Sequence, residues 1–230
     1  MAKHIGIVAV SPEGTALFYG QITRQLAKLA PPNDQPRITV HNEPVNAYIE
    51  AIRRGDWHGV ARLLRRSADF LATAGAEICL VPDNIVQHAL PLAQSGSPIA
   101  WLVMTDMVAR SIEADRRRVV GVIGTKLVTE SSTYQTALGM RGIQVLPPTA
   151  DEAETLEQII FGELLYGNIR PESRHAVHEI IRHFAARGCE GVILACSEAP
   201  LVVTSENSSL PVYDAADILA EGAVRTCLVC

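Results

Sequence analysis

The sequence lacks the features of membrane and secreted proteins. No apolar run approaches the length of about 20 residues that a helix needs to cross a bilayer. Residues 1–4 lead straight into an apolar segment, without the apolar core and cleavage site of a signal peptide. We therefore expect no membrane partner and a cytoplasmic location.

Positive charge is scarce as well. Lysine and arginine number 20 against 25 aspartates and glutamates, which gives a net charge of −5 with histidine neutral. A protein that binds nucleic acid needs a basic surface to neutralise the phosphates. The charge balance therefore argues against nucleic acid as a partner.

Cysteines and cofactor motifs are also few. Five cysteines, an odd number without a secretory signal, indicate free thiols in a reducing compartment. The sequence has neither the Walker lysine motif nor the dinucleotide glycine fingerprint. His175 and His178 lie one helical turn apart, but no carboxylate or cysteine follows at a metal-site spacing. We expect neither a nucleotide nor a metal ion.

What the sequence does contain is an alternation of short apolar runs with longer amphipathic segments, which is typical of α/β proteins. Its 230 residues, 48% apolar and 20% charged, suffice for one domain or two small ones. Strands are predicted at residues 5–10, 37–41, 78–81, 98–103, 119–124, 142–146 and 192–195, and helices at 16–29, 56–73, 153–167, 171–187 and from 216. The basic cluster of the second helix is expected to face solvent; it comprises Arg62, Arg65 and Arg66.

One strand ends on an unusual set of polar residues. The wholly apolar run 192–195 is typical of a strand buried on both faces of a parallel sheet, and Cys196, Ser197 and Glu198 follow it directly. In open α/β sheets the chemistry lies just outside the carboxyl ends of the strands. Cys196 is therefore the first candidate for a catalytic residue, and the alternative is an inert core thiol.

The chain contains an internal repeat. Shifted by 113 positions, residues 75–84 align without a gap on residues 188–197, and Asp83 then coincides with Cys196. A second match, residues 5–9 on 120–124, has the similar offset of 115. We therefore predict two similar halves, each with a polar residue at an equivalent strand end. The predicted lobes are residues 1–103, rejoined by a C-terminal helix at 216–230, and residues 104–215.

Other polar residues stand at predicted strand ends, and each has a structural alternative. The turn at Ser11 can offer backbone N–H groups to an anion or serve only as a connection. Asn42 can bind a ligand or form a turn, and Asp83 with Asn84 can act in a site or cap the next helix. Hydroxyl donors to a carboxylate are expected from the residues that open the second half, Thr125 and Thr129.

Taken together, these segments resemble the aspartate/glutamate racemase superfamily over nearly the whole chain. The first-strand motif is matched by residues 6–15, the opening of the second lobe by Gly124, Thr125 and Thr129, and the second cysteine motif by residues 191–200. Glu172-Ser173-Arg174 and Pro211-Val212-Tyr213-Asp214 fit the pattern too. The resemblance implies two α/β lobes, each a mainly parallel sheet flanked by helices, with the active site in the cleft between them. It also implies a homodimer and no cofactor.

The family's mechanism uses two cysteines on opposite sides of the substrate α-carbon, one removing the α-proton and the other returning a proton. Here Cys196 matches the second cysteine, whereas Asp83 stands where the first is usual. The ordinary pKa of an aspartate, about 4, is far from that of a cysteine, about 8.5, although burial can raise it. The carboxylate of the substrate would be held by Asn42, Asn84, Thr125 and Ser197, with backbone donors from Ser11 and Thr129.

The substrate and the reaction remain open at this point. Tyr166 precedes Gly167 where some aspartate racemases have a lysine for the distal carboxylate, and Leu219 replaces a usual histidine. The first hypothesis is an amino-acid racemase or epimerase that acts on aspartate- or glutamate-like substrates through Cys196 and Asp83. The alternatives are a single-cysteine decarboxylase or isomerase of malonate-type acids, and a binder of a small carboxylic acid without catalysis.

Overall fold

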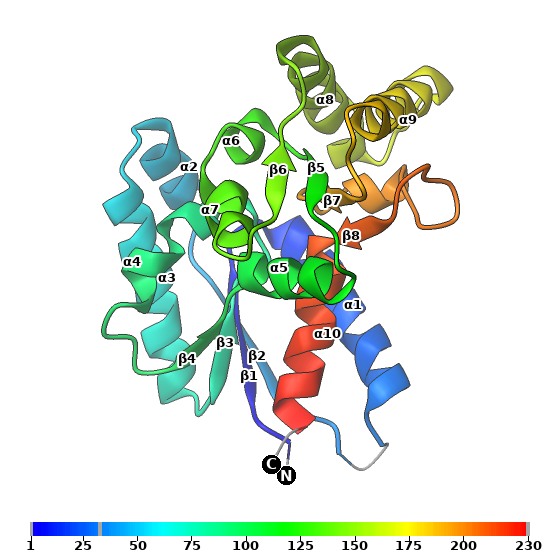
Figure 1. Ribbon diagram of the computed structural model, residues 1–230. Helices are drawn as coiled ribbons and strands as arrows, with labels where there is room; N and C mark the ends of the chain where they lie inside the picture. Colours follow the sequence, from blue (N-terminus) through cyan, green and yellow to red (C-terminus); the bar gives the residue numbers. More distant parts are fainter. Residues whose placement is uncertain (1, 32–33, 229–230) are drawn as a thin grey trace. The chain divides into compact units, whose positions relative to one another are not determined.

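A computed structural model describes residues 2–31 and 34–228, and the chain falls into two compact units. The first unit comprises Met1–Met107 with Ala216–Cys230, and the second comprises Val108–Ala215. Each contains a four-stranded sheet in which every described strand pair is parallel (Figure 1). The predicted class, two similar lobes with parallel sheets flanked by helices, is confirmed.

In the first unit the strands lie in the order β2-β1-β3-β4. They alternate with helices along the chain, so that each parallel connection crosses over through a helix. The elements are β1 (Ile5–Ala9), α1 (Pro12–Leu29), β2 (Ile38–Asn42), α2 (Val45–Arg53), α3 (Trp57–Thr73), β3 (Ile78–Leu80), the 3-10 helix η1 (Ile85–Ala89), α4 (Leu90–Gln94) and β4 (Ala100–Leu102), with α10 (Ala215–Leu228) returning to this unit.

The second unit repeats this order as β6-β5-β7-β8. Its helices include one with a complete capping box, in which Thr149 and Glu152 satisfy each other's backbone N–H groups. The elements are α5 (Met104–Ala114, which begins in the first unit), β5 (Val119–Ile123), α6 (Lys126–Thr129), α7 (Thr133–Gly139), β6 (Gln144–Leu146), α8 (Ala150–Gly162), η2 (Leu164–Tyr166), α9 (Pro171–Ala186), β7 (Val192–Leu194), η3 (Ala199–Leu201) and β8 (Val212–Asp214).

Each unit has its own apolar core. In the first, residues of β1 and β3 pack with α3, and in the second, residues of β5 and β7 pack with α8 and α9. Burial of these side chains is the main favourable term in folding. Among the described residues, no helix is both long enough and apolar enough to cross a bilayer.

The sequence repeat has a counterpart in backbone geometry. Gly75 and Gly188, which the repeat aligns, turn the chain ahead of β3 and β7 with φ angles of +88° and +87°, a region that glycine occupies readily. The aligned carboxylates of Glu77 and Glu190 also make equivalent hydrogen bonds. Glu77 accepts a hydrogen bond from the N–H of His4 ahead of β1, and Glu190 accepts one from the N–H of Arg118 ahead of β5.

The central strands carry a second aligned pair of glycines, Gly6 and Gly121, beneath a helix side chain. A Cβ at Gly6 would lie 3.1 Å from Leu71 of α3, and one at Gly121 would lie 2.6 Å from the ring of Phe184 in α9. Separations under 3.0 Å require the neighbour to move. The absence of a side chain at Gly121 therefore allows α9 to pack closely against β5.

We expect Gly121→Ala to lower the free energy of unfolding by about 1–3 kcal/mol, the usual cost of overpacking a core. The matched control is Gly139→Ala at the end of α7, where a Cβ would meet nothing within 4 Å. Urea unfolding of both variants measures the difference. Equal stability of the two variants would contradict a tight β5–α9 contact.

Several predicted element boundaries were wrong. The first helix begins at Pro12, four residues before the predicted start at Ala16. The reason is a cap: the Ser11 hydroxyl accepts a hydrogen bond from the N–H of Gly14 at 3.1 Å, and proline is well suited to the first helical turn. Some strands are also shorter than predicted, most clearly β4 at residues 100–102 and β6 at residues 144–146.

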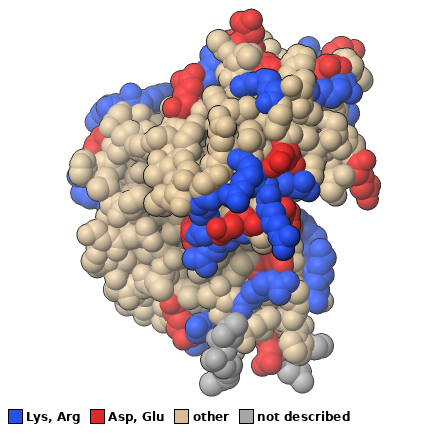
Figure 2. Space-filling view, in the orientation of Figure 1, with Lys and Arg blue, Asp and Glu red and all other residues tan. Residues whose placement is uncertain are grey.

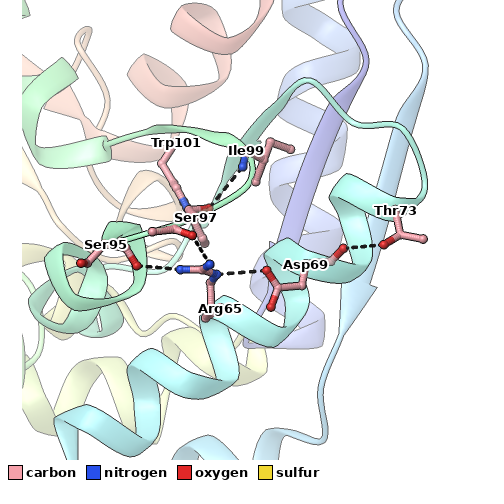
Figure 3. Close-up of polar contacts among 8 residues, drawn as sticks. Arg65, Asp69, Thr73, Ser95, Ser97, Ile99 and Trp101 are labelled. Atoms are coloured by element: carbon pink, nitrogen blue, oxygen red, sulfur yellow. Dashed lines mark hydrogen bonds and ion pairs between the residues drawn. The ribbon is translucent and has the colours of Figure 1, made fainter.

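Arg66 is exposed, as predicted, and Arg65 is half-buried, but both also make specific contacts. Arg65 donates to the carbonyl oxygen of Ser95 at 2.7 Å and to Asp69 at 3.0 Å, which ties the loop ahead of β4 to α3 (Figure 3). Arg66 donates two hydrogen bonds to Glu43, just after β2. These arginines therefore hold loops at the two ends of the first sheet.

Candidate active site

The predicted site residues lie at strand ends and form two clusters. The first cluster belongs to the first unit and follows β1, β2 and β3; it comprises Ser11, Asn42, Asp83 and Asn84. The second cluster belongs to the second unit and follows β5 and β7; it comprises Thr125, Thr129, Cys196 and Ser197. Because β1 pairs in parallel with β2 and β3, and β5 with β7, each cluster lies along one edge of its own sheet.

Asp83 is the titratable residue of the first cluster. One of its carboxylate oxygens accepts hydrogen bonds from the N–H groups of Ile85 at 2.9 Å and Val86 at 3.3 Å, so it caps the start of η1. The buried amide of Gln87 donates to the backbone oxygens of Val81 and Asp83, at 3.0 and 3.1 Å. These bonds fix the turn that carries the half-buried carboxylate of Asp83.

The other members of this cluster differ in the hydrogen-bond donors that they have available for a ligand. The Ser11 hydroxyl is occupied by the helix cap, so a ligand contact there would have to use the backbone. The exposed Asn42 donates its amide hydrogens to the carbonyl oxygens of Ala9, at 3.1 Å, and Glu43, at 2.8 Å. Both amide hydrogens of Asn42 are therefore occupied. Asn84 is buried beside Asp83.

Cys196 carries the reactive group of the second cluster. It is 8% exposed and packs at the end of the core formed by α8, α9 and β7. Its Sγ donates a hydrogen bond of 3.0 Å to Oε2 of Glu198. A carboxylate at this distance can accept the thiol proton, but its negative charge opposes formation of the thiolate.

The surroundings of Cys196 determine its protonation state. Burial raises the pKa of the thiol, and the negative charge and hydrogen bond of Glu198 raise this pKa further. Hydrogen bonds from the backbone N–H groups of Glu198 and Ala199 act in the opposite direction, because they stabilise the thiolate. Cys196 is therefore a neutral thiol at rest, with donors already in place for the charged form.

Two buried hydroxyl groups lie in the second cluster. The Oγ1 atoms of Thr125 and Thr129 are buried and have no hydrogen-bond partner among the described residues. Burying a hydroxyl without a partner costs free energy, so such groups usually hydrogen-bond to a ligand or a water. The prediction that Thr129 donates from its backbone was wrong, because its N–H already bonds the carbonyl oxygen of Thr125 at 3.0 Å. Its side chain is the available group.

A glycine brings the two strands of the second cluster together. A Cβ at Gly124 would lie 2.9 Å from the carbonyl oxygen of Ala195, and the N–H of Ala195 bonds the carbonyl oxygen of Ile123 at 2.7 Å. The residues that follow, Thr125 and Cys196, therefore start from adjacent points at the end of β5 and β7.

The sequence prediction missed two residues of these clusters. Glu198 belongs to the motif that follows the strand, but its hydrogen bond with Cys196 was not predicted. This bond depends on the turn that brings residue 198 back to residue 196. Gln87 holds the turn that carries Asp83.

Comparisons with known proteins show the family of this chain. The sequence profile of the Asp/Glu/Hydantoin racemases matches residues 7–223. The chain belongs to this family. Racemases are isomerases, so it is an enzyme of that class, and its family supports an amino-acid racemase activity.

Individual relatives cover the chain almost fully. A glutamate racemase from Shouchella clausii is 27% identical over 218 residues, which span 92% of this chain and 72% of that protein. A crystal structure of a Yersinia pestis protein assigned to the Asp/Glu racemases has a TM-score of 0.91 at 28% identity, covering 98% of this chain and 99% of the other. An aspartate racemase homologue from Pyrococcus horikoshii gives 0.89 at 26% identity, with coverage of 98% and 99%.

Proposed function

We propose that this family member is a cofactor-independent racemase or epimerase of amino acids, acting on aspartate- or glutamate-like substrates. Cys196 and Asp83 would be its two acid/base groups. The observation that carries the proposal is the buried thiol of Cys196, bonded to Glu198 at the carboxyl end of β7. The repeat assigns Asp83 to the equivalent position after β3.

On the cysteine side, Glu198 accepts the thiol proton while the backbone N–H groups of Glu198 and Ala199 stabilise the thiolate. The thiolate then takes the α-proton of one enantiomer and becomes a thiol again. In the reverse direction the thiol gives its proton to the carbanion-like intermediate. Each step moves one proton between sulfur and the α-carbon, so no other reactant is consumed.

On the opposite face of the α-carbon, Asp83 acts in its protonated form as the acid when the Cys196 thiolate removes the α-proton. In the other direction the Asp83 carboxylate removes the α-proton and the Cys196 thiol supplies one. The hydrogen bonds from Ile85 and Val86 occupy one carboxylate oxygen and hold its orientation. A positioned base is effective because the entropy of orientation is lost on folding and not in the reaction.

The α-carboxylate of the substrate would be bound by the buried hydroxyl groups of Thr125 and Thr129, which lack a partner among the described residues. Ser197, Asn84 and the backbone of Ser11 would add donors. Such donors stabilise the negative charge that spreads onto the carboxylate as the α-proton leaves. Tyr166, 77% exposed, offers no charge to a distal carboxylate, so neutral amino acids belong in any test of substrates. The homodimer implied by the resemblance stays a prediction.

The proposal is tested by α-proton exchange in deuterated water, followed by NMR on L- and D-aspartate, L- and D-glutamate and neutral amino acids. Exchange with inversion from both enantiomers is the expected result. Exchange with retention from one enantiomer would mean that only one face has a competent base. Release of carbon dioxide from a disubstituted malonate, without exchange on amino acids, would favour the single-cysteine decarboxylase instead.

We expect Glu198→Gln to lower the pKa of Cys196, because the substitution removes the negative charge that opposes the thiolate. More thiolate at a fixed pH makes iodoacetamide alkylation of Cys196 several times faster. Inversion of the substrate should become slower in the same variant, because Glu198 no longer accepts the proton. Mass spectrometry of the peptide that contains Cys196 measures the alkylation rate at pH 8.

The matched control is Glu206→Gln, an exposed carboxylate in the same unit. It should leave both the alkylation rate and the turnover unchanged. An alkylation rate in Glu198→Gln equal to that of the wild type would show that the carboxylate does not control the thiol.

A further inference from the structure

A pocket of about 220 Å³ lies in the second unit, at the opposite end of the sheet from the second cluster. It opens ahead of β5 and β6, since Arg118 directly precedes β5 and Ile143 directly precedes β6. β5 is five residues long, so this pocket lies about 16 Å from the carboxyl end of that strand. It is lined by Glu113, Arg116, Arg117, Arg118, Arg141 and Ile143. We call it the arginine pocket.

The arginine pocket carries an excess of positive charge. Its lining holds four arginines and one glutamate, in a chain whose net charge is −5. Arg141 pairs with Glu113 at 2.7 Å. The guanidinium groups of Arg116, Arg117 and Arg118 have no carboxylate within ion-pair distance among the residues that the structure describes. Figure 2 shows basic side chains gathered over the end of α5, with acidic ones among them.

The nearby carboxylates are engaged by other groups. Asp115 accepts a hydrogen bond from the hydroxyl of Tyr213 at 2.7 Å, and Glu190 accepts one from the backbone N–H of Arg118. Arg117 hydrogen-bonds the hydroxyl of Tyr213 and lowers its pKa, although burial and Asp115 raise that pKa to about 12 overall. The Nε of Arg117 is buried and has no hydrogen-bond partner among the described residues. An unpaired buried donor of this kind is costly unless an acceptor binds to it.

The internal repeat conserves only part of this positive charge. At the offset of 115, Ala2 of the first unit aligns with Arg117, and Lys3 aligns with Arg118. Arg116 moreover adopts a left-handed backbone conformation, with φ of +58°, which disfavours every residue except glycine and some asparagines and aspartates. Like charges gathered at one turn repel one another, and a bound anion would relieve this repulsion.

We propose that the arginine pocket binds a phosphate dianion, either free or as the end of a phosphomonoester. Three guanidinium groups without a carboxylate partner among the described residues match a tetrahedral dianion better than a carboxylate, because its oxygens can accept several forked hydrogen bonds at once. The volume suits a small anion, since each water takes about 30 Å³ of space. The inference concerns a second site and does not depend on the racemase reaction.

The test is isothermal titration calorimetry of the full chain at pH 7.5 and constant ionic strength. The probes are inorganic phosphate, glycerol phosphate and malonate. Saturable binding of either phosphate compound is expected, and the tighter of the two identifies the source of the dianion. Arg116→Gly and Arg118→Gln should each weaken this binding about tenfold. The control Arg182→Gln, an exposed arginine of α9 paired with Glu179, should bind like the wild type.

The variant at position 116 separates binding from folding. Glycine accepts a positive φ, so Arg116→Gly should melt at the same temperature as the wild type or above it while losing phosphate. Binding should also weaken below pH 6, where a phosphomonoester loses its second charge. The proposal would be overturned by undiminished phosphate binding in Arg116→Gly and Arg118→Gln, by malonate binding as tightly as phosphate, or by no phosphate binding in the wild type.

Discussion

Cys196→Ala is expected to abolish inversion of the substrate, with a fall in kcat/KM of about 10² to 10⁴-fold, the usual contribution of a positioned acid/base group. The physical reason is that the substitution removes the thiol that Glu198 contacts after β7, so one face of the α-carbon loses its proton donor and acceptor. Exchange in deuterated water should survive, slowly and with retention, for the enantiomer whose proton faces the other base.

Cys189→Ala is the matched control for this prediction. Cys189 is a buried thiol of the same core, three residues before β7, and burial also raises its pKa. Its loss should reduce stability slightly through a small cavity and leave kcat unchanged. Thermal melting of both variants separates a folding defect from a catalytic one. Unchanged turnover in Cys196→Ala would refute the proposed mechanism.

Asp83→Asn should have an effect of similar size on inversion and the opposite stereochemical signature. Asparagine keeps an oxygen that can accept the hydrogen bonds from Ile85 and Val86, so the cap of η1 is retained while the base is lost. Exchange should then persist for the enantiomer that Cys196 deprotonates, which is the one that Cys196→Ala leaves inert. NMR on each pure enantiomer measures this difference.

Asp83→Ala provides the comparison, because it removes both the cap and the base. Its melting temperature should fall below that of Asp83→Asn, since loss of an N-cap typically costs about 1 kcal/mol. If Asp83→Asn turned over like the wild type while Asp83→Ala only lost stability, Asp83 would be a capping residue. Cys196 would then act alone, as in the single-cysteine alternative.

Much of the architecture followed from local patterns in the sequence. Short apolar runs such as 192–195 are readable because a strand buried on both faces needs apolar residues at every position. The repeat predicted two similar lobes, and its alignment also paired Asp83 with Cys196. The family was indicated by short motifs with unusual residue types, such as the cysteine after β7, because a motif is a run of neighbouring residues and can be recognised in the sequence.

Boundaries and partners required the tertiary structure. The start of α1 depends on the Ser11 hydroxyl, which accepts from Gly14 only once the turn has formed. The helical pattern places Arg65 on the surface, yet its guanidinium donates a hydrogen bond to the carbonyl oxygen of Ser95, 30 positions away in the sequence.

The sequence by itself therefore determined the fold class, the family and the two acid/base candidates, because periodicity and residue type are local properties. The tertiary structure alone decided which donors are already occupied, as with Asn42 and the N–H of Thr129, and which lack a partner among the described residues, as with the two threonine hydroxyls. It also brought Glu198 to Cys196 and gathered Arg141 with the arginines ahead of β5. Hydrogen bonds and charge clusters form between residues that the chain separates, so only the folded chain reveals them.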